Sequence, residues 1–345
     1  MFRTRAFRVS SVLVLVAALG ALFLARVDAS LVERVYARGI FPVIGQALGG
    51  LSGRVGWSVT EPGALLAASA LIWAVRRGWR RARFWVGLVG VAALVWIGFQ
   101  AVWGVNYRRE PIATAFGLTV RPSSTDELRA LAADLTEEIN RSAASTPTTG
   151  DLPGVLAAAP GIFAAAADRY PFLGGDYAPP KPLVASELLS WLALLGFYNP
   201  FTAEPNINVR TPDFLIPYVV LHEMAHARGV ASEDEASFVG YLLGRDSGEP
   251  RFRYAALWQA TVYVYGAWRA VDPEGGARGY ETLAPRVQAD VAAYAAWRKQ
   301  HASPLSTLAR TVNDTYLRSQ GVQDGVQSYG RLTDLVLAEW RTRPR

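Results

Sequence analysis

The chain has 345 residues, no cysteine and a formal net charge of +6 at pH 7. The lack of cysteine excludes a disulfide framework and a thiolate metal site. Much of the positive excess comes from arginines that flank apolar stretches, so lipid headgroups of a bilayer are the expected partner. No basic-aromatic recognition motif is present, and a nucleic-acid partner is therefore not expected.

Three apolar stretches in the first third of the chain are about long enough to cross a ~30 Å hydrocarbon layer. They cover residues 9–25, 57–75 and 84–105. The second is the weakest because Glu61 lies near its start, and a short buried helix is the alternative there. The first has an uncharged run of 17 residues, which favours a retained anchor over a cleaved signal peptide. The sequence predicts a membrane region over 1–106 and one domain over 107–345.

Arginines set the predicted orientation of these spans. Eight of them precede the first span or separate the second from the third: Arg3, Arg5, Arg8, Arg76, Arg77, Arg80, Arg81 and Arg83. The positive-inside rule places both groups in the cytoplasm. With three spans, everything after about Tyr107 then lies outside the membrane, whereas an even number of spans would place it in the cytoplasm.

Beyond the spans, the spacing of apolar residues predicts a mostly helical domain. Ser124 and Glu127 form a capping box that opens a helix through about Arg141. Residues 144–161 are rich in Thr, Pro, Gly and Ala and predict a loop. Helical spacing then covers 252–271, 279–300, 303–319 and 324–342, with His301 expected on the surface or as a cap at a polar helix end.

One stretch, Gly196 to Val209, differs from its helical surroundings. Its prolines, aromatic residues and polar alternation predict a hairpin or an edge strand, where Pro200 and Pro205 are tolerated. Such a strand can hold an extended peptide by main-chain pairing, and a surface hairpin without a ligand is the equal alternative.

The segment His222-Glu223-Met224-Ala225-His226 carries the chemistry. Positions i and i+4 share one face of a helix, so both imidazoles point at one spot. Glu223, next to the first histidine, is then placed to take a proton from a water on a metal ion. Pro217 suits the first turn of this helix and Gly229 its end. The pattern predicts one Zn²⁺ per chain.

A third protein ligand is needed, and the sequence offers it just after Gly229. The metzincin pattern would place it at Ser232, a poor zinc ligand, so that arrangement fails. A second helix starting near Ser232 instead places Glu235 in its first turn, and we predict Glu235 as the third ligand. Ser232 and Glu235 also match a capping box, and if Glu235 only caps the helix, Glu233 is the next candidate.

Several motifs are spread from residue 180 to residue 331. They include Gly196-Phe197-Tyr198-Asn199-Pro200-Phe201-Thr202, His222-Glu223-Met224-Ala225-His226-Ala227-Arg228-Gly229, Asn313-Asp314-Thr315-Tyr316-Leu317 and Ser328-Tyr329-Gly330-Arg331. Together they resemble the domain of unknown function 3810 family, bacterial membrane proteins with a zincin-like motif. The resemblance implies a multi-pass protein of the bacterial inner membrane with a gluzincin-like, mostly helical peptidase domain. Val239 stands where gluzincins have an aspartate, so that match is partial.

The predicted activity is zinc-dependent hydrolysis of a peptide bond in a protein or peptide substrate. His222, His226 and Glu235 hold the metal, and Glu223 is the general base. Candidates for substrate binding or for a donor to the oxyanion are Tyr198, Asn206, Tyr241 and Tyr329. A zinc-binding scaffold without turnover and a hydrolase of a non-peptide amide remain open, and the sequence does not determine the oligomeric state.

Overall fold

The structure is a computed structural model that describes residues 2–148, 150–322 and 331–343. It is mainly helical with one small sheet, as the sequence predicts. The first third contains α1 (Phe2–Leu24), α2 (Ala29–Leu31), the π-helix η1 (Val32–Ile40), α3 (Phe41–Ser52), α4 (Thr60–Gly78), α5 (Ala82–Val102) and the 3-10 helix η2 (Gly104–Arg108).

The rest of the chain contains the helices around the sheet. They are α6 (Ile112–Ala115), α7 (Thr125–Ser145), α8 (Leu152–Ala167), η3 (Pro171–Leu173), α9 (Ser186–Trp191), α10 (Ile216–Ala227), α11 (Glu233–Asp246), α12 (Pro250–Val271), α13 (Pro273–Glu281), α14 (Pro285–Gln300), α15 (Pro304–Ser319) and α16 (Leu332–Thr342). The strands are β1 (Lys181–Pro182), β2 (Gly196–Asn199) and β3 (Glu204–Ile207).

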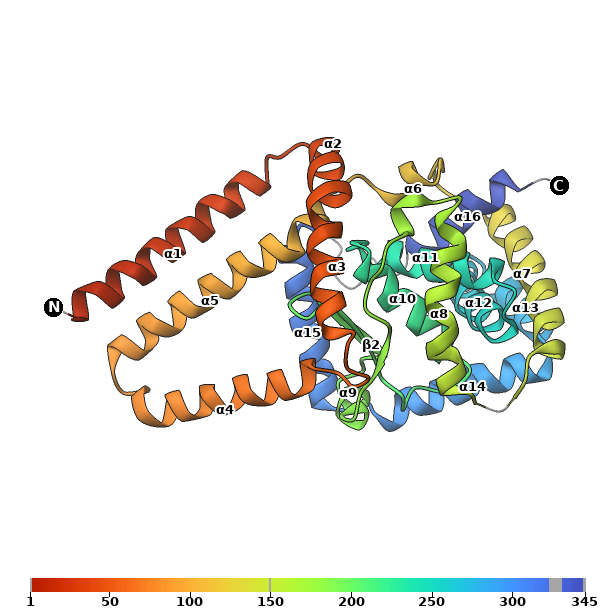
Figure 1. The fold of residues 1–345 in the computed structure, drawn as a ribbon. Coiled ribbons are helices and arrows are strands. Elements are labelled where there is room, and N and C mark those ends of the chain that lie inside the picture. Colours follow the sequence, from red (N-terminus) through yellow and green to blue (C-terminus); the bar gives the residue numbers. More distant parts are fainter. Residues whose placement is uncertain (1, 149, 323–330, 344–345) are drawn as a thin grey trace.

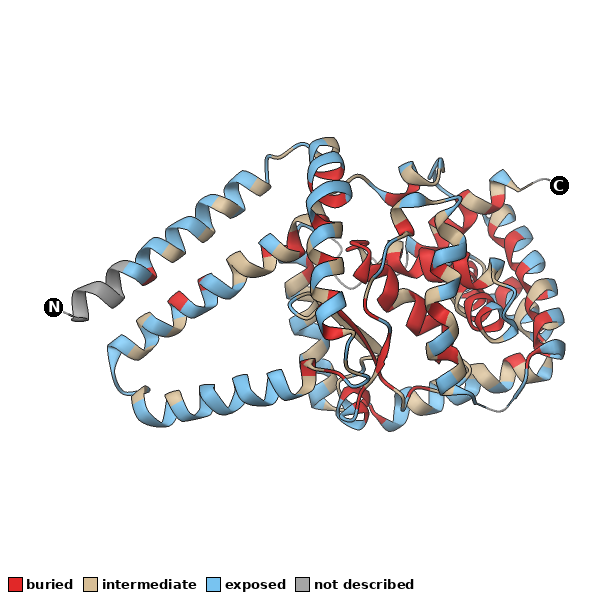
Figure 2. Cartoon of the chain, viewed as in Figure 1, coloured by how far each residue is buried: buried red, intermediate tan, exposed pale blue. Residues whose placement is uncertain are grey.

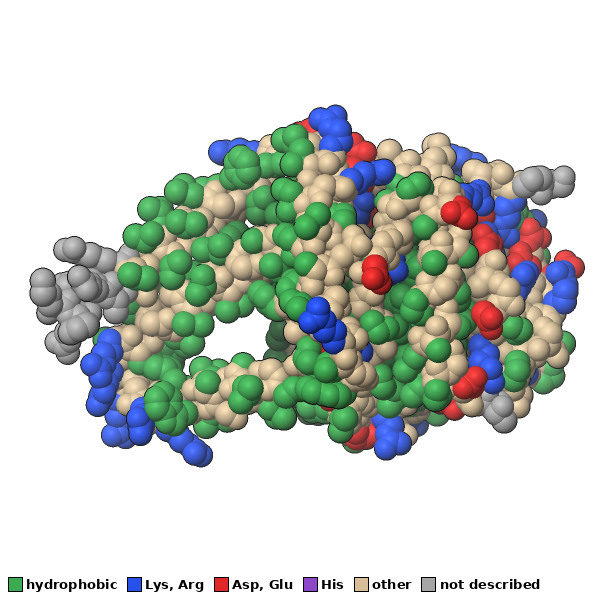
Figure 3. All heavy atoms as spheres, in the orientation of Figure 1, with side chains coloured by type: hydrophobic (Ala, Val, Ile, Leu, Met, Phe, Trp, Pro, Cys, Tyr) green, Lys and Arg blue, Asp and Glu red, His purple; other side chains and the backbone are tan. Residues whose placement is uncertain are grey.

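Helices α1, α4 and α5 project from the body of the molecule, and α1 packs along α5 (Figure 1). Most of their residues are exposed (Figure 2), and many of the exposed side chains are hydrophobic (Figure 3). By length and apolarity α5 can cross a membrane, and the bent pair formed by Val9–Leu24 and Ala29–Ser52 passes the same test as one unit. The three predicted stretches correspond mostly to α1, α4 and α5, and α5 alone among them meets the criterion of a span by itself.

The segment between the first two apolar stretches is also helical. The chain turns by 105° after α1, and α2, η1 and α3 then run across the body (Figure 1). Val32, Tyr36 and Phe41 on their inner face are buried, and Gly49 lies against the backbone of Ala178. This burial explains the helix, because a buried apolar stripe stabilises helical structure that composition alone does not favour.

The core of the body is formed by α10 and the helices packed around it. These helices hold most of the buried residues (Figure 2). Helix α10 packs against α11, α12 and α8. Helix α7 begins with the predicted capping box, in which Ser124 and Glu127 bond to each other's backbone N–H groups. The helices predicted over 252–271 and 303–319 are present, and the one predicted over 279–300 is divided into α13 and α14. Part of the stretch 324–342 lies outside the described residues.

One local prediction was wrong, and a second was right in part. The loop predicted over 144–161 contains most of α8, which includes Pro160. Val155, Ala159 and Phe163 are buried at helical spacing, so packing outweighs the effect of the proline and glycine content. His301 follows α14 as a cap, as one alternative had it, but its side chain is buried and bonds to the carbonyl oxygen of Trp297 at 2.8 Å.

The three strands form a mixed sheet in the order β1-β3-β2, so the predicted hairpin is confirmed as β2 and β3. The C=O of Ile207 accepts a hydrogen bond from the N–H of Leu183 on the β1 side. In an antiparallel pair the bonded residues alternate. The register therefore turns the N–H and C=O groups of Gly196 and Tyr198 away from β3, toward the open edge of β2. Outside the sheet, no described residue hydrogen-bonds to these four groups.

A buried ion pair joins the sheet to the start of α4. The Lys181 ammonium lies 2.6 Å from a carboxylate oxygen of Glu204, and both side chains are almost fully buried. Burial acts to raise the pKa of Glu204, but hydrogen bonds from Lys181, Thr60 and Val59 outweigh it and hold the pKa below its usual value. Glu204 also accepts from the N–H of Thr60, the first residue of α4.

We expect the Lys181→Met variant to lose about 3–5 kcal/mol of stability, because it leaves the Glu204 carboxylate buried without its cation. Thermal unfolding in detergent, followed by circular dichroism, measures the loss. The double variant Lys181→Met/Glu204→Leu should recover part of it, because neither charge is then left unpaired. An unchanged unfolding temperature in the single variant would contradict the structural role of this pair.

Candidate metal centre

The candidate site lies on helix α10, whose boundaries follow from local sequence. Pro217 occupies its first turn, where a missing N–H costs nothing. The chain leaves the helix through Gly229, which has a φ of +78° and is therefore in the left-handed region that favours glycine. An added Cβ there would lie 2.8 Å from the Phe41 ring. This tight turn brings the start of α11 back against α10.

The two histidines of α10 meet one carboxylate from α11. Their Nε2 atoms lie 3.1 Å apart. An oxygen of Glu233 lies 3.2 Å from Nε2 of His222 and 3.4 Å from Nε2 of His226. All three side chains are largely buried. Three ligand atoms from two helices thus converge on one point.

The other ring nitrogens have partners that orient the imidazoles. Nδ1 of His226 lies 2.6 Å from the carbonyl oxygen of Val230, and since a carbonyl can only accept, Nδ1 donates. In the neutral ring this leaves a lone pair on Nε2. Nδ1 of His222 lies 3.3 Å from the Ser237 hydroxyl. Supporting hydrogen bonds of this kind are typical around metal-binding histidines.

The charges within the cluster respond to burial and to each other. Burial lowers the pKa of His222. Burial acts to lower the pKa of His226 as well, but the nearby Glu233 carboxylate outweighs it and raises that pKa to about 9. For Glu233, burial is outweighed by the two imidazoles, which hold its pKa well below the usual value. The cluster is thus built around one buried negative charge that stabilises a cation beside it, either the His226 imidazolium or a metal ion.

The residues fit a zinc ion. A tetrahedral site with bonds of about 2.0–2.1 Å separates its ligand atoms by about 3.3 Å, and the three separations here are 3.1, 3.2 and 3.4 Å. The set of two imidazoles and one carboxylate is one that catalytic zinc uses. One carboxylate oxygen of the buried Glu223 has no hydrogen-bond partner among the described residues. This unpaired oxygen of Glu223 belongs to the residue next to His222 in the chain.

Comparison with known protein families matches residues 36–337 to the family described as protein of unknown function (DUF3810). The chain belongs to this family. The match extends from η1 into α16 and includes the whole candidate centre. No curated protein and no solved structure matches the chain.

The geometry of this DUF3810 protein corrects the choice of third ligand, because it brings Glu233 and not Glu235 to the histidines. Glu235 accepts a hydrogen bond from the N–H of Ile112 at 2.7 Å and lines a cavity of about 480 Å³ together with Arg109. The capping box predicted from Ser232 is not formed. Glu235 thus faces a different neighbour from Glu233. It neither lies at the histidines nor forms the predicted capping box.

Glu223 is buried between α10 and the sheet. One carboxylate oxygen would lie 2.8 Å from a Cβ added at Gly196, so only glycine leaves room for it at this position of β2. Burial raises the pKa of Glu223 to about 8. A cation held by the neighbouring histidines would favour the charged form. Glu223 is thus adjacent to His222 in sequence and lies against the edge strand β2 in space.

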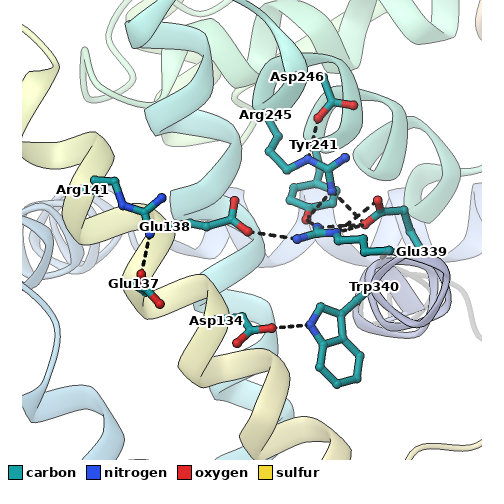
Figure 4. Close-up of polar contacts among 10 residues, drawn as sticks. Asp134, Glu137, Glu138, Arg141, Tyr241, Arg245, Asp246, Glu339 and Trp340 are labelled. Atoms are coloured by element: carbon teal, nitrogen blue, oxygen red, sulfur yellow. Dashed lines mark hydrogen bonds and ion pairs between the residues drawn. The ribbon is translucent and has the colours of Figure 1, made fainter. Parts of the chain in front are cut away.

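Of the other four predicted site residues, the structure describes three, and none of these three hydrogen-bonds to the histidines. Tyr198 is connected to them through Trp103, because its ring lies 5.7 Å from that of Trp103, which is 6.1 Å from the His226 ring. The Asn206 amide is buried and bonded to Ser58 and Glu204. Tyr241 contacts the guanidinium group of Arg245 in a cluster next to α16 (Figure 4). Tyr329 lies outside the described residues.

Two residues at the centre were not singled out by sequence reasoning. The indole N–H of Trp103 donates to the carbonyl oxygen of His226 at 3.2 Å. Tyr316, on α15, accepts a hydrogen bond from the hydroxyl of Tyr107 at 3.2 Å. Burial raises the pKa of Tyr316, and Glu233 is close enough for its charge to contribute. The only signal for Tyr316 was its place in a motif shared with the family, and Trp103 had none.

Proposed function

We propose that this protein is a membrane-anchored zinc metallopeptidase of the zincin type. The observation that carries the proposal is the convergence of His222, His226 and Glu233, with the unpaired carboxylate oxygen of Glu223 beside them. Two histidines and a glutamate leave one position of a tetrahedral zinc site open. The test is loss of hydrolysis with retention of zinc in the Glu223→Gln variant.

His222, His226 and Glu233 would hold the ion, and Glu223 would act on the water. Zinc, when bound, polarises a carbonyl group and makes a water molecule acidic near neutral pH. Glu223 accepts a proton from the attacking water. The water oxygen adds to the carbonyl carbon of the substrate. As the C–N bond breaks, Glu223 passes the proton to the leaving amine, so that the carboxylate is regenerated.

The open edge of β2 supports binding of an extended peptide. Gly196 and Tyr198 direct their backbone N–H and C=O groups away from β3. Gly196 also contacts Glu223, which places one end of this edge beside the proposed general base. A substrate strand that adds to β2 would gain main-chain hydrogen bonds at the reacting position.

Tyr316 is the residue we expect to stabilise the oxyanion. The Tyr107 hydroxyl donates to it, so its own proton is not used in that bond. The Tyr316→Phe variant should lower kcat by about 10²–10³-fold with little change in KM. Steady-state hydrolysis of a fluorogenic peptide measures this. Tyr107→Phe is the matched control and should have the smaller effect, and an unchanged kcat in Tyr316→Phe would exclude the role.

We further propose that α1, α4 and α5 cross the membrane. The start of α1 and the arginine-rich turn between α4 and α5 both lie at the far end of the projecting helices, and the body lies at the other end (Figure 1). The positive-inside rule favours a cytoplasmic position for both arginine groups. The candidate centre would then lie outside the cytoplasm, next to the bilayer.

A further inference from the structure

The candidate metal centre lies directly at the end of the projecting helix α5. Trp103 is the first residue after α5, and its indole bonds to the carbonyl oxygen of His226. Phe99 and Gln100, in the last turn of α5, contact Tyr316 and Gln320 of the α15 region. More than a hundred residues of sequence separate His226 from α5, yet one side chain connects them in space.

The open strand β2 runs from this centre toward the projecting helices. It starts at Gly196 beside Glu223, and the turn that follows it lies between α4 and α5. In that turn Phe201 lies 3.6 Å from a Cβ added at Gly98 of α5. The Asn199 amide and the Thr202 hydroxyl bond to Thr60 of α4. At about 3.3 Å per residue, the strand covers about 10 Å between the centre and these helices.

Helix α15 adds an apolar surface near the same centre. Leu305, Leu308 and Val312 are 42%, 59% and 59% exposed, although all three are large and hydrophobic. Their spacing places them on one face of the helix, and that face continues to Tyr316. An exposed apolar stripe that leads to a reactive centre is typical of a surface that binds an apolar partner.

No charged residue interrupts the route along α5. The sequence from Phe84 to Tyr107 contains no Asp, Glu, Lys or Arg. This surface offers a soluble peptide no polar contacts, whereas a polypeptide that emerges from the bilayer beside α5 would reach β2 within about ten extended residues. Anchoring in the same membrane would also raise its effective concentration at the centre.

We infer that the substrates are polypeptides anchored in the same membrane, cut in an extended segment within about ten residues of the bilayer. The inference rests on the proposed hydrolysis and on the proposed membrane arrangement. Strand β2 would pair with this segment, and the α15 stripe would contact its apolar side chains. Proximity to the membrane would be the main determinant of substrate specificity, and the sequence around the cleaved bond would be the second.

The test compares new protein N-termini in cells that produce the full chain or its Glu223→Gln variant. Mass spectrometry of the membrane and soluble fractions identifies termini that only the wild type generates. We expect these termini in membrane proteins, within about ten residues of a transmembrane segment. Cuts spread over soluble proteins, or far from any membrane segment, would overturn the inference and leave the proposed hydrolysis intact.

Failure of the proposed function itself would look different. If the two cell populations gave the same termini, and the zinc-loaded protein cleaved neither tethered nor soluble probes, both proposals would fall together. The probes are a fluorogenic peptide and the same peptide joined to a single transmembrane helix, both presented with the protein in vesicles of phosphatidylethanolamine and phosphatidylglycerol. Tethering should raise the cleavage rate at least about tenfold through effective concentration.

Two matched variants of α15 test the apolar stripe. Leu308→Asp places a charge on the stripe, and Thr307→Asp places one at an exposed position on the side of the same helix that is turned away from the stripe. We expect Leu308→Asp to slow cleavage of the tethered probe several-fold and Thr307→Asp to leave it unchanged. Equal effects of the two variants would exclude the stripe as a substrate contact.

Discussion

The Glu223→Gln variant is expected to lose hydrolysis while it keeps its zinc. The side chain keeps its shape but no longer accepts a proton, and general-base catalysis by a positioned group contributes about 10²–10⁴-fold to the rate. The carboxylate is not among the three side chains that converge at the centre, so the affinity for the metal should change little. Hydrolysis of a fluorogenic peptide library and elemental mass spectrometry of the same sample measure both quantities.

The two measurements also separate the proposed peptidase from a zinc-binding scaffold. A scaffold would hold about one zinc per chain but hydrolyse nothing in either form. Cleavage by Glu223→Gln at the wild-type rate would show that another group takes the proton. Glutamine is the suitable replacement because Glu223 packs against Gly196, where a larger change would disturb β2.

The largest effect on metal content is expected from Glu233→Ala. Loss of this carboxylate removes one of the three proposed ligands and the only anionic one among them. Loss of a group that merely supports a ligand costs about 10–100-fold in affinity, so loss of the ligand itself should cost at least about 100-fold. The purified variant should therefore contain little zinc, measured by elemental mass spectrometry after dialysis against a buffered zinc solution.

Glu235→Ala is the matched control, because Glu235 lies in the same first turn of α11. It should keep about one zinc per chain and lose only the hydrogen bond to the N–H of Ile112. If that loss unfolds the protein, Glu235→Gln retains an acceptor for the same N–H. Zinc retained in a folded Glu233→Ala variant, and lost from the Glu235 variant, would restore the ligand choice made from sequence.

The choice between the two glutamates shows where prediction from sequence ended. Residues two apart on a helix point in nearly opposite directions, at about 100° per residue. Which of them faces His222 depends on how α11 rotates against α10, and that rotation is set by packing around Phe238 and Tyr241. The predicted helix start near Ser232 was right, but it does not contain this information.

Local pattern was sufficient for several features of this protein. The two histidines share a face of α10 because helical periodicity fixes their relation, and Pro217 and Gly229 mark the ends of that helix. The hairpin of β2 and β3 and the capping box of α7 were also predicted, since each depends on residues close in sequence. The loop predicted from composition at α8 was wrong, because buried residues at helical spacing stabilise a helix there despite Pro160.

The sequence by itself determined the histidine pair, the neighbouring Glu223 and the apolar N-terminal stretches. Only the tertiary structure decided that Glu233 completes the cluster, that Tyr316 lies near it and that Trp103 joins it to α5. The physical reason is the range of the interactions. Periodicity and caps act over a few residues, whereas these contacts join residues far apart in the chain and depend on how whole helices pack.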